Sequence, residues 1–134
     1  MMSLRMLGDM TGRRVLITGG TGHLGRVMAE TVAEQGAAVL LLDRPGSPFE
    51  ELEVHLKGAW GIECESIACD LEDESARNDA IRSVLNDGKP LNCLVNNAAF
   101  VGTSDLEGWS TGFEAQSLHT WHQTLRLRIH QPSS

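Results

Sequence analysis

The sequence contains no tyrosine, only three phenylalanines and three tryptophans, and no long apolar run. A chain without about twenty consecutive apolar residues has no segment that could cross a bilayer as a helix. The first ten residues also lack the charged region and apolar core of a secretion signal. We therefore expect a cytoplasmic protein that does not bind a membrane, with residues 1–12 as a leader and residues 131–134 as a disordered tail.

Positive charge is scarce as well. The chain has 11 Lys and Arg residues against 18 Asp and Glu residues, and its net charge of −7 argues against nucleic acid as a partner. The cysteines Cys64, Cys69 and Cys93 are odd in number, which favours reduced thiols over a disulfide framework. His119 and His122 lie three residues apart without a third ligand nearby, so we expect no metal site.

What the sequence does contain is a strand, a glycine-rich turn and a helix in direct succession, from Val15 to Gly25. The apolar residues 15–17 predict a strand buried on both faces of a parallel sheet. The glycines that follow allow the backbone to bend sharply and to approach a ligand. The next helix points its free N–H groups at the same place, where an anion is stabilised. This pattern favours a bound dinucleotide pyrophosphate over the alternative, a tight turn without a ligand.

The rest of the chain alternates strands and helices, and its length predicts one domain. We expect strands at residues 14–18, 38–42, 62–69 and 91–95 and helices at residues 23–35, 49–57 and 74–85. Such alternation predicts a parallel sheet with right-handed crossovers and strand order 3-2-1-4, which is a doubly wound, Rossmann-like α/β fold. We assign this domain to residues 13–130. It is truncated after the fourth strand and a following helix that we expect to begin at Ser117.

Helical periodicity predicts which side chains two of these helices bury. In the first helix the expected apolar stripe consists of Val27, Met28, Thr31 and Val32. In the helix at residues 74–85 it consists of Ala80, Ile81, Val84 and Leu85.

Polar residues follow the ends of the expected strands. Asp43 lies eighteen residues after Gly25, about the distance expected for the acid that holds a ribose hydroxyl. The third strand leads into Asp70, and the fourth ends in Asn96-Asn97-Ala98-Ala99. A cofactor would lie across these carboxyl ends, where the winding of the sheet reverses.

Together these motifs resemble the short-chain dehydrogenase/reductase family, from Val15 to about Leu127. Thr18-Gly19-x-x-Gly22-x-x-Gly25 resembles the family's phosphate-binding turn, Asp70-Leu71 its adenine-binding pair, and the segment after the fourth strand its Asn-Asn-Ala-Gly motif. The resemblance implies that the turn surrounds the pyrophosphate, Asp43 holds the adenosine ribose, Asp70 holds the adenine amino group and Asn97 lines the ribose side. The predicted cofactor-binding residues are Gly19, Thr21, Gly22, His23, Leu24, Gly25, Asp43, Arg44, Asp70, Leu71, Asn97, Ala98 and Ala99.

The turn departs from the short branch of that family. His23 stands where the short branch has glycine, and Gly22 comes one place earlier, as in the extended branch of sugar-nucleotide epimerases and dehydratases. The Asn-Asn-Ala-Ala segment is similar to the short branch, which we favour. A fragment of an extended-branch enzyme remains an alternative.

The resemblance also bears on catalysis. The family uses an asparagine in the helix after the fourth strand, a serine after the fifth strand and a Tyr-x-x-x-Lys pair. This chain has no tyrosine, and Arg128 stands where the asparagine is expected. We therefore predict no catalytic residues in it and no activity by itself. In the complete enzyme, hydride would pass between the nicotinamide and a small alcohol or carbonyl substrate. A non-catalytic nucleotide-binding or interaction module is the alternative.

Two further expectations concern the cofactor and self-association. A carboxylate at Asp43 would accept from the ribose hydroxyls and repel a 2′-phosphate, so we expect NAD rather than NADP. Arg44 is the counter-argument, because a guanidinium can bind a phosphate. The fourth strand would lie at the edge of the sheet, where unpaired backbone favours a homo-oligomer.

Overall fold

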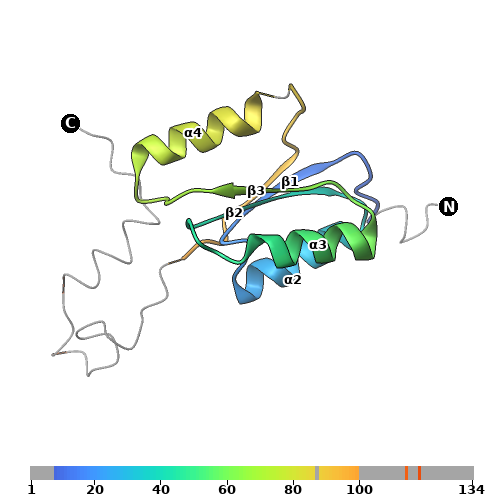
Figure 1. The fold of residues 1–134 in the computed structure, drawn as a ribbon, viewed down its shortest axis with the longest axis horizontal. Coiled ribbons are helices and arrows are strands. Elements are labelled where there is room, and N and C mark those ends of the chain that lie inside the picture. Colours follow the sequence, from blue (N-terminus) through green and yellow to red (C-terminus); the bar gives the residue numbers. More distant parts are fainter. Residues whose placement is uncertain (1–7, 87, 100–113, 115–117, 119–134) are drawn as a thin grey trace. The chain divides into compact units, whose positions relative to one another are not determined.

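The computed structural model describes residues 8–86, 88–99, 114 and 118, and the chain divides into two units, residues 1–97 and residues 98–134. Apart from Leu118, the helix expected from Ser117 falls outside the described residues, as do Arg128 and the tail at residues 131–134. The elements of the first unit, in chain order, are β1 (Arg14–Thr18), α2 (His23–Glu34), β2 (Ala38–Asp43), α3 (Phe49–Trp60), β3 (Cys64–Ala68), α4 (Glu74–Leu85) and β4 (Cys93–Val95) (Figure 1).

The four strands form one parallel sheet with the order β3-β2-β1-β4. This confirms the predicted order 3-2-1-4. The second strand returns to one side of the first, whereas the fourth lies on the other side, so the winding reverses between β1 and β4. The carboxyl ends of the strands therefore lie at one edge of the sheet.

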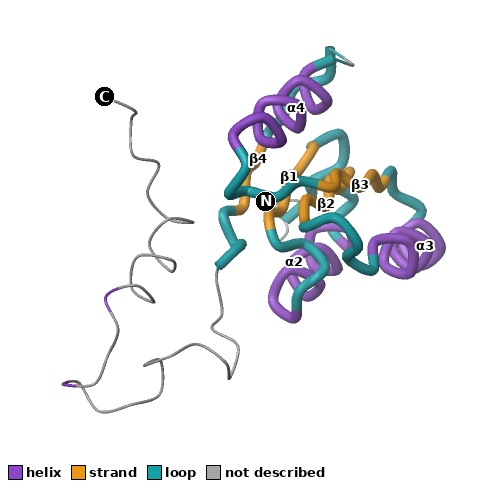
Figure 2. The backbone as a smooth tube through the Cα atoms, turned by 60° about the vertical axis from the view of Figure 1, so that its left-hand side comes forward, coloured by secondary structure: helices purple, strands orange, loops and turns teal. Residues whose placement is uncertain are grey.

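The sheet is covered on both faces (Figure 2). Because side chains alternate along a strand, Val15 and Ile17 of β1 share a face with their neighbours on β2 and pack against α2 and α3. Leu16 of β1 lies on the opposite face and belongs to a second cluster with Ala80 and Val84 of α4. Both faces of β1 and β2 are thus buried, which explains why these strands are almost continuously apolar.

The helices bury a narrower stripe than the sequence predicts. In α2 the buried residues are Gly25, Ala29 and Ala33. The expectation was wrong for Val27, which is 64% exposed, and for Thr31, which is exposed; Met28 and Val32 are partly buried against the core. Gly25, Ala29 and Ala33 are small and lie four positions apart, so they let the backbone of α2 approach the sheet. Larger side chains on either side of this row lie at the edge of the contact between helix and sheet and are less buried.

The same correction applies to α4. Ala80 and Val84 are buried as expected, whereas Ile81 and Leu85 are 56% and 62% exposed. Burial again follows the four-residue spacing of the side chains that lie directly above the sheet. Among the described residues, no helix is both long and apolar enough to cross a membrane.

Helix ends follow local capping chemistry. Helix α4 begins where expected, because the Asp73 side chain accepts hydrogen bonds from the N–H groups of Ser75 and Ala76. Helix α3 continues beyond Gly58 to Trp60, since its left-handed cap residue is Gly61, with a φ of 64°. The strands β3 and β4 are shorter than predicted. Residues 8–12, expected to be a leader, include Met10, whose N–H donates to the Gln35 carbonyl oxygen at 2.8 Å.

Candidate cofactor-binding site

The turn between β1 and α2 is anchored to the neighbouring strand. The N–H of Gly20 donates to the Leu42 carbonyl oxygen at 3.2 Å, and the N–H of Gly22 donates to the Gly19 carbonyl oxygen at 3.1 Å. Gly19 has a φ of 64°, a left-handed conformation that favours glycine. The turn is therefore a defined structure at the carboxyl edge of the sheet.

Glycine at position 25 is required by packing. A Cβ atom there would lie 2.1 Å from the Gly19 carbonyl oxygen and 2.8 Å from the Gly20 Cα atom. The backbone of α2 therefore approaches the backbone of the turn so closely that only glycine fits at this position. Gly20 is also constrained, because its Cβ atom would come within 3.1 Å of the Ile17 carbonyl oxygen.

The amino end of α2 has no cap from a side chain. Its N-cap residue is Gly22, which makes no side-chain hydrogen bond, and its first turn contains no acidic residue. Helix α4 differs, since Asp73 caps it. His23 and Leu24 at the start of α2 are exposed, so at this helix end the backbone N–H groups are the donors available to a ligand. Uncapped N–H groups and the positive end of a helix dipole fit an anionic group such as a pyrophosphate.

Asp43, the last residue of β2, is held by the turn. Its Oδ2 atom accepts hydrogen bonds from the Thr21 N–H at 3.0 Å and from the Thr21 hydroxyl at 2.6 Å. Its Oδ1 atom accepts from the Arg44 N–H at 2.8 Å. The structure thus brings together two residues predicted for the cofactor site that are 22 positions apart.

Asn97 links the end of β4 to the same turn. Its side-chain amide donates to the carbonyl oxygens of Thr18 and Gly19, both at 3.1 Å. Its N–H donates to the Thr18 hydroxyl oxygen at 3.0 Å. The sequence predicts this residue as part of the cofactor site, and the observed contacts show that its amide group supports the turn. Ala98 and Ala99 belong to the second unit.

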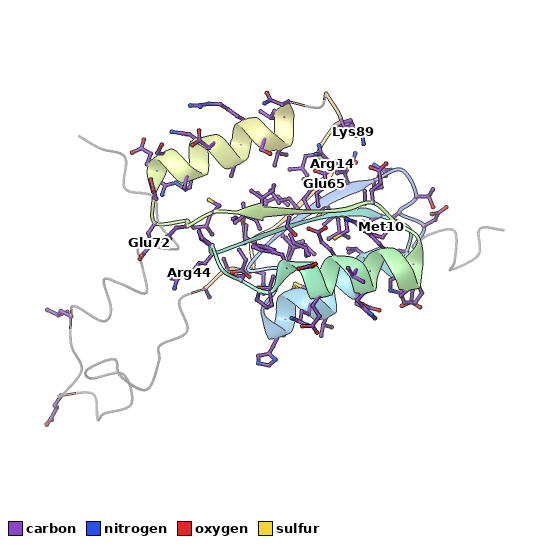
Figure 3. All side chains as sticks on the ribbon, viewed as in Figure 1. Met10, Arg14, Arg44, Glu65, Glu72 and Lys89 are labelled. Carbon is purple, nitrogen blue, oxygen red and sulfur yellow. The ribbon has the colours of Figure 1, made fainter. Side chains whose placement is uncertain are left out.

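Asp70 and Leu71 follow β3 at this edge of the sheet. The Asp70 Oδ1 atom accepts from the Glu72 N–H at 3.0 Å, and the Leu71 carbonyl oxygen accepts from the Arg77 side chain at 2.7 Å. The N–H of Cys69 donates to the Asp43 carbonyl oxygen at 2.8 Å, which connects this segment to β2. Figure 3 shows Arg44 and Glu72 at the same end of the first unit.

Arg26 is a site residue that the sequence analysis did not identify. Its Nε atom donates to the Thr21 carbonyl oxygen at 3.0 Å, and its guanidinium lies 3.5 Å from a Glu51 oxygen of α3. The sequence does contain a signal for this contact. Arg26 is a long basic residue in the first turn of the helix, from where its side chain can reach back to the glycine-rich loop.

The described residues contain no group of three or more His, Cys, Asp or Glu side chains that could hold a metal ion. His119 and His122 lie outside them. Burial raises the pKa of the Cys64 thiol to about 11, so this cysteine stays protonated at neutral pH and is a poor nucleophile.

Comparison with known proteins gives consistent matches. The short chain dehydrogenase family matches residues 13–131. The rhamnolipids biosynthesis 3-oxoacyl-(acyl-carrier-protein) reductase of Pseudomonas aeruginosa is 28% identical over 121 residues, which are 90% of this chain and 44% of that protein.

Two solved structures are similar over most of the described fold. The NADPH-dependent 3-quinuclidinone reductase from Rhodotorula rubra has a TM-score of 0.77 and 31% identity, over 96% of this chain and 46% of that one. A xylitol dehydrogenase bound to NAD+ has a TM-score of 0.76 and 27% identity, over 90% and 44%. The chain thus spans less than half the length of these three proteins.

Proposed function

Because the chain belongs to the short-chain dehydrogenase family, we propose that it is the cofactor-binding part of an oxidoreductase that uses NAD. In the complete enzyme, hydride passes between the nicotinamide and a small alcohol or carbonyl substrate. The main support for the proposal is the turn after β1. There the amino end of α2 has no side-chain cap, Gly25 lets this helix pack closely against the turn, and the Asp43 carboxylate binds the turn residue Thr21.

Each part of this site has a distinct role in binding. The backbone N–H groups at the start of α2 hold the pyrophosphate, and Gly25 keeps that helix end close to the turn. Asp43 accepts a hydrogen bond from the adenosine ribose, and Asp70 accepts one from the adenine amino group. Asn97 fixes the carbonyl groups of the turn. The nicotinamide supplies the hydride chemistry when it is bound.

The preference for NAD rests on Asp43. Its carboxylate repels a 2′-phosphate and accepts from a ribose hydroxyl. The two similar structures do not decide the question, since one protein is NADPH-dependent and the other is bound to NAD+. Arg44 is exposed, and we assign it no phosphate.

The cofactor preference predicts a result for isothermal titration. We expect the chain to bind NADH at least tenfold more tightly than NADPH, and Asp43→Ala to remove most of that difference, because a lost charge-assisted hydrogen bond corresponds to roughly tenfold in affinity. Arg44→Ala tests the alternative, that Arg44 binds a 2′-phosphate, and should change NADPH affinity by no more than about twofold. Tighter binding of NADPH than of NADH, together with a loss of NADPH affinity in Arg44→Ala, would contradict the preference for NAD.

A second prediction concerns turnover. The chain contains no tyrosine, and a missing general acid or base lowers a rate by about 10² to 10⁴. We expect no oxidation or reduction of NAD(H) above background across a panel of alcohols and carbonyl compounds, measured at 340 nm with chain of verified mass. The same preparation must bind NADH, which shows that its site is formed. Turnover by this polypeptide would refute the prediction.

The match to the short chain dehydrogenase family favours this function over a fragment of a sugar-nucleotide epimerase and over a non-catalytic module. Self-association remains part of the proposal, because β4 lies at an edge of the sheet and Leu94 within it is 51% exposed. A cytoplasmic location also remains a proposal.

A further inference from the structure

Thr21 and Asp43 form a pair whose hydrogen bonds are unevenly distributed. Both donors of Thr21, the N–H and the hydroxyl, bind the same carboxylate oxygen, Oδ2, at 3.0 Å and 2.6 Å. The Arg44 N–H binds Oδ1 at 2.8 Å. An ionised carboxylate accepts roughly four hydrogen bonds, two at each oxygen. Oδ2 is therefore saturated, and the remaining acceptor site of Asp43 is on Oδ1.

The position of Thr21 is itself held from two sides. The Thr21 carbonyl oxygen accepts from Arg26 of α2 at 3.0 Å. The preceding residue, Gly20, donates to the carbonyl oxygen of Leu42, the residue before Asp43, at 3.2 Å. The hydroxyl of Thr21 thus meets Asp43 in a geometry that neighbouring backbone contacts support.

The hydroxyl has a second property that follows from this contact. A threonine hydroxyl carries one proton and two lone pairs, and its proton is donated to Asp43. Toward any other molecule the Thr21 oxygen can only accept. The side chains of Thr21 and Asp43 therefore present hydrogen-bond acceptors to a ligand, and neither presents a donor.

We propose that Thr21 is a positioning and specificity-determining residue for the cofactor. It directs the free acceptor of Asp43 toward one hydroxyl of the adenosine ribose, and its own oxygen accepts from the other. Such a pair selects an unphosphorylated ribose diol, which brings two donors, against a 2′-phosphate, which brings only acceptors. The inference rests on the proposed function and adds to it a residue that sets its selectivity.

The test uses the full chain and isothermal titration with NADH and with NADPH. Thr21→Val keeps the size of the side chain and removes the hydroxyl, and we expect it to weaken NADH binding about tenfold while leaving NADPH binding unchanged. Thr21→Ser restores a hydroxyl and should bind NADH within about twofold of the unmodified chain. Thermal unfolding of all three proteins shows whether they are folded.

A double variant separates positioning from a general effect on the turn. If Thr21 acts partly through Asp43, Thr21→Val should weaken NADH binding less in an Asp43→Ala background than in the unmodified chain, because only the direct hydrogen bond from the ribose to Thr21 remains to be lost. Equal weakening of NADH and NADPH by Thr21→Val, or an unchanged NADH affinity, would overturn the inference and leave the proposed function standing. Failure of the unmodified, folded chain to bind either dinucleotide would overturn the proposed function and, with it, this inference.

Discussion

Substitution of Gly25 by alanine is expected to remove dinucleotide binding and to lower the free energy of unfolding by about 3 kcal/mol. The new Cβ atom would lie 2.1 Å from the Gly19 carbonyl oxygen and 2.8 Å from the Gly20 Cα atom. Both are backbone atoms and cannot rotate away as a side chain can, so α2 must move away from the turn. Its first-turn N–H groups would move with it, and these are the groups proposed to hold the pyrophosphate.

Urea unfolding measures the stability change, and titration with NADH measures the loss of binding. Gly58→Ala is the matched control, because Gly58 lies within α3 and a Cβ atom there would meet nothing within 4 Å. Alanine favours a helix over glycine by about 1 kcal/mol, so the control should be at least as stable as the unmodified chain. A Gly25→Ala protein with unchanged stability and NADH affinity would disprove the packing argument.

Substitution of Arg14 by methionine is expected to lower the free energy of unfolding by about 3 kcal/mol. Arg14 is only 6% exposed, and its guanidinium donates to the carbonyl oxygens of Val84 at 2.9 Å and Lys89 at 3.2 Å. Val84 lies in the last turn of α4, where a cation also interacts favourably with the helix dipole. Methionine fills similar space but cannot donate a hydrogen bond to the buried Val84 carbonyl oxygen.

The same unfolding experiment compares this variant with Arg82→Met. Arg82 lies on α4 and is exposed, and its ion pair with Asp79 is a surface contact, so its loss should change stability by about 0.5 kcal/mol or less. Arg14 and Lys89 lie at the opposite end of the sheet from Arg44 (Figure 3). The folded Arg14→Met protein should therefore bind NADH normally. If the two substitutions lowered the free energy of unfolding equally, the buried contacts of Arg14 would add nothing to stability beyond those of an exposed arginine.

Local patterns were sufficient for the elements and their order. The β-branched run at Val15 and Ile17 marks β1, whose predicted bounds agree with the structure. The predicted start of the helix at residue 74 also agrees with the structure, in which Asp73 caps α4. The alternation of strands and helices predicted a doubly wound sheet with the order 3-2-1-4, and the structure has that order. These features depend on residues close together in the sequence, so periodicity and turn chemistry predict them.

The faces of the helices and the supports of the site depended on tertiary contacts. Periodicity alone selected Ile81 and Leu85 as buried, but distance from the sheet decides burial, and both are largely exposed. Asn97 was predicted from a motif as a cofactor residue, and only the pairing of β1 with β4 shows that its amide supports the turn.

By itself the sequence determined the fold class, the glycine turn and the acid at the end of the second strand, because each of these follows from a pattern of residues close together in the chain. Only the tertiary structure decided that Thr21 binds Asp43 and that Arg26 holds the Thr21 carbonyl group. The first contact joins residues 22 positions apart. Its distance and angle are set by the register of two strands and the packing of α2 at Gly25, which no local pattern specifies.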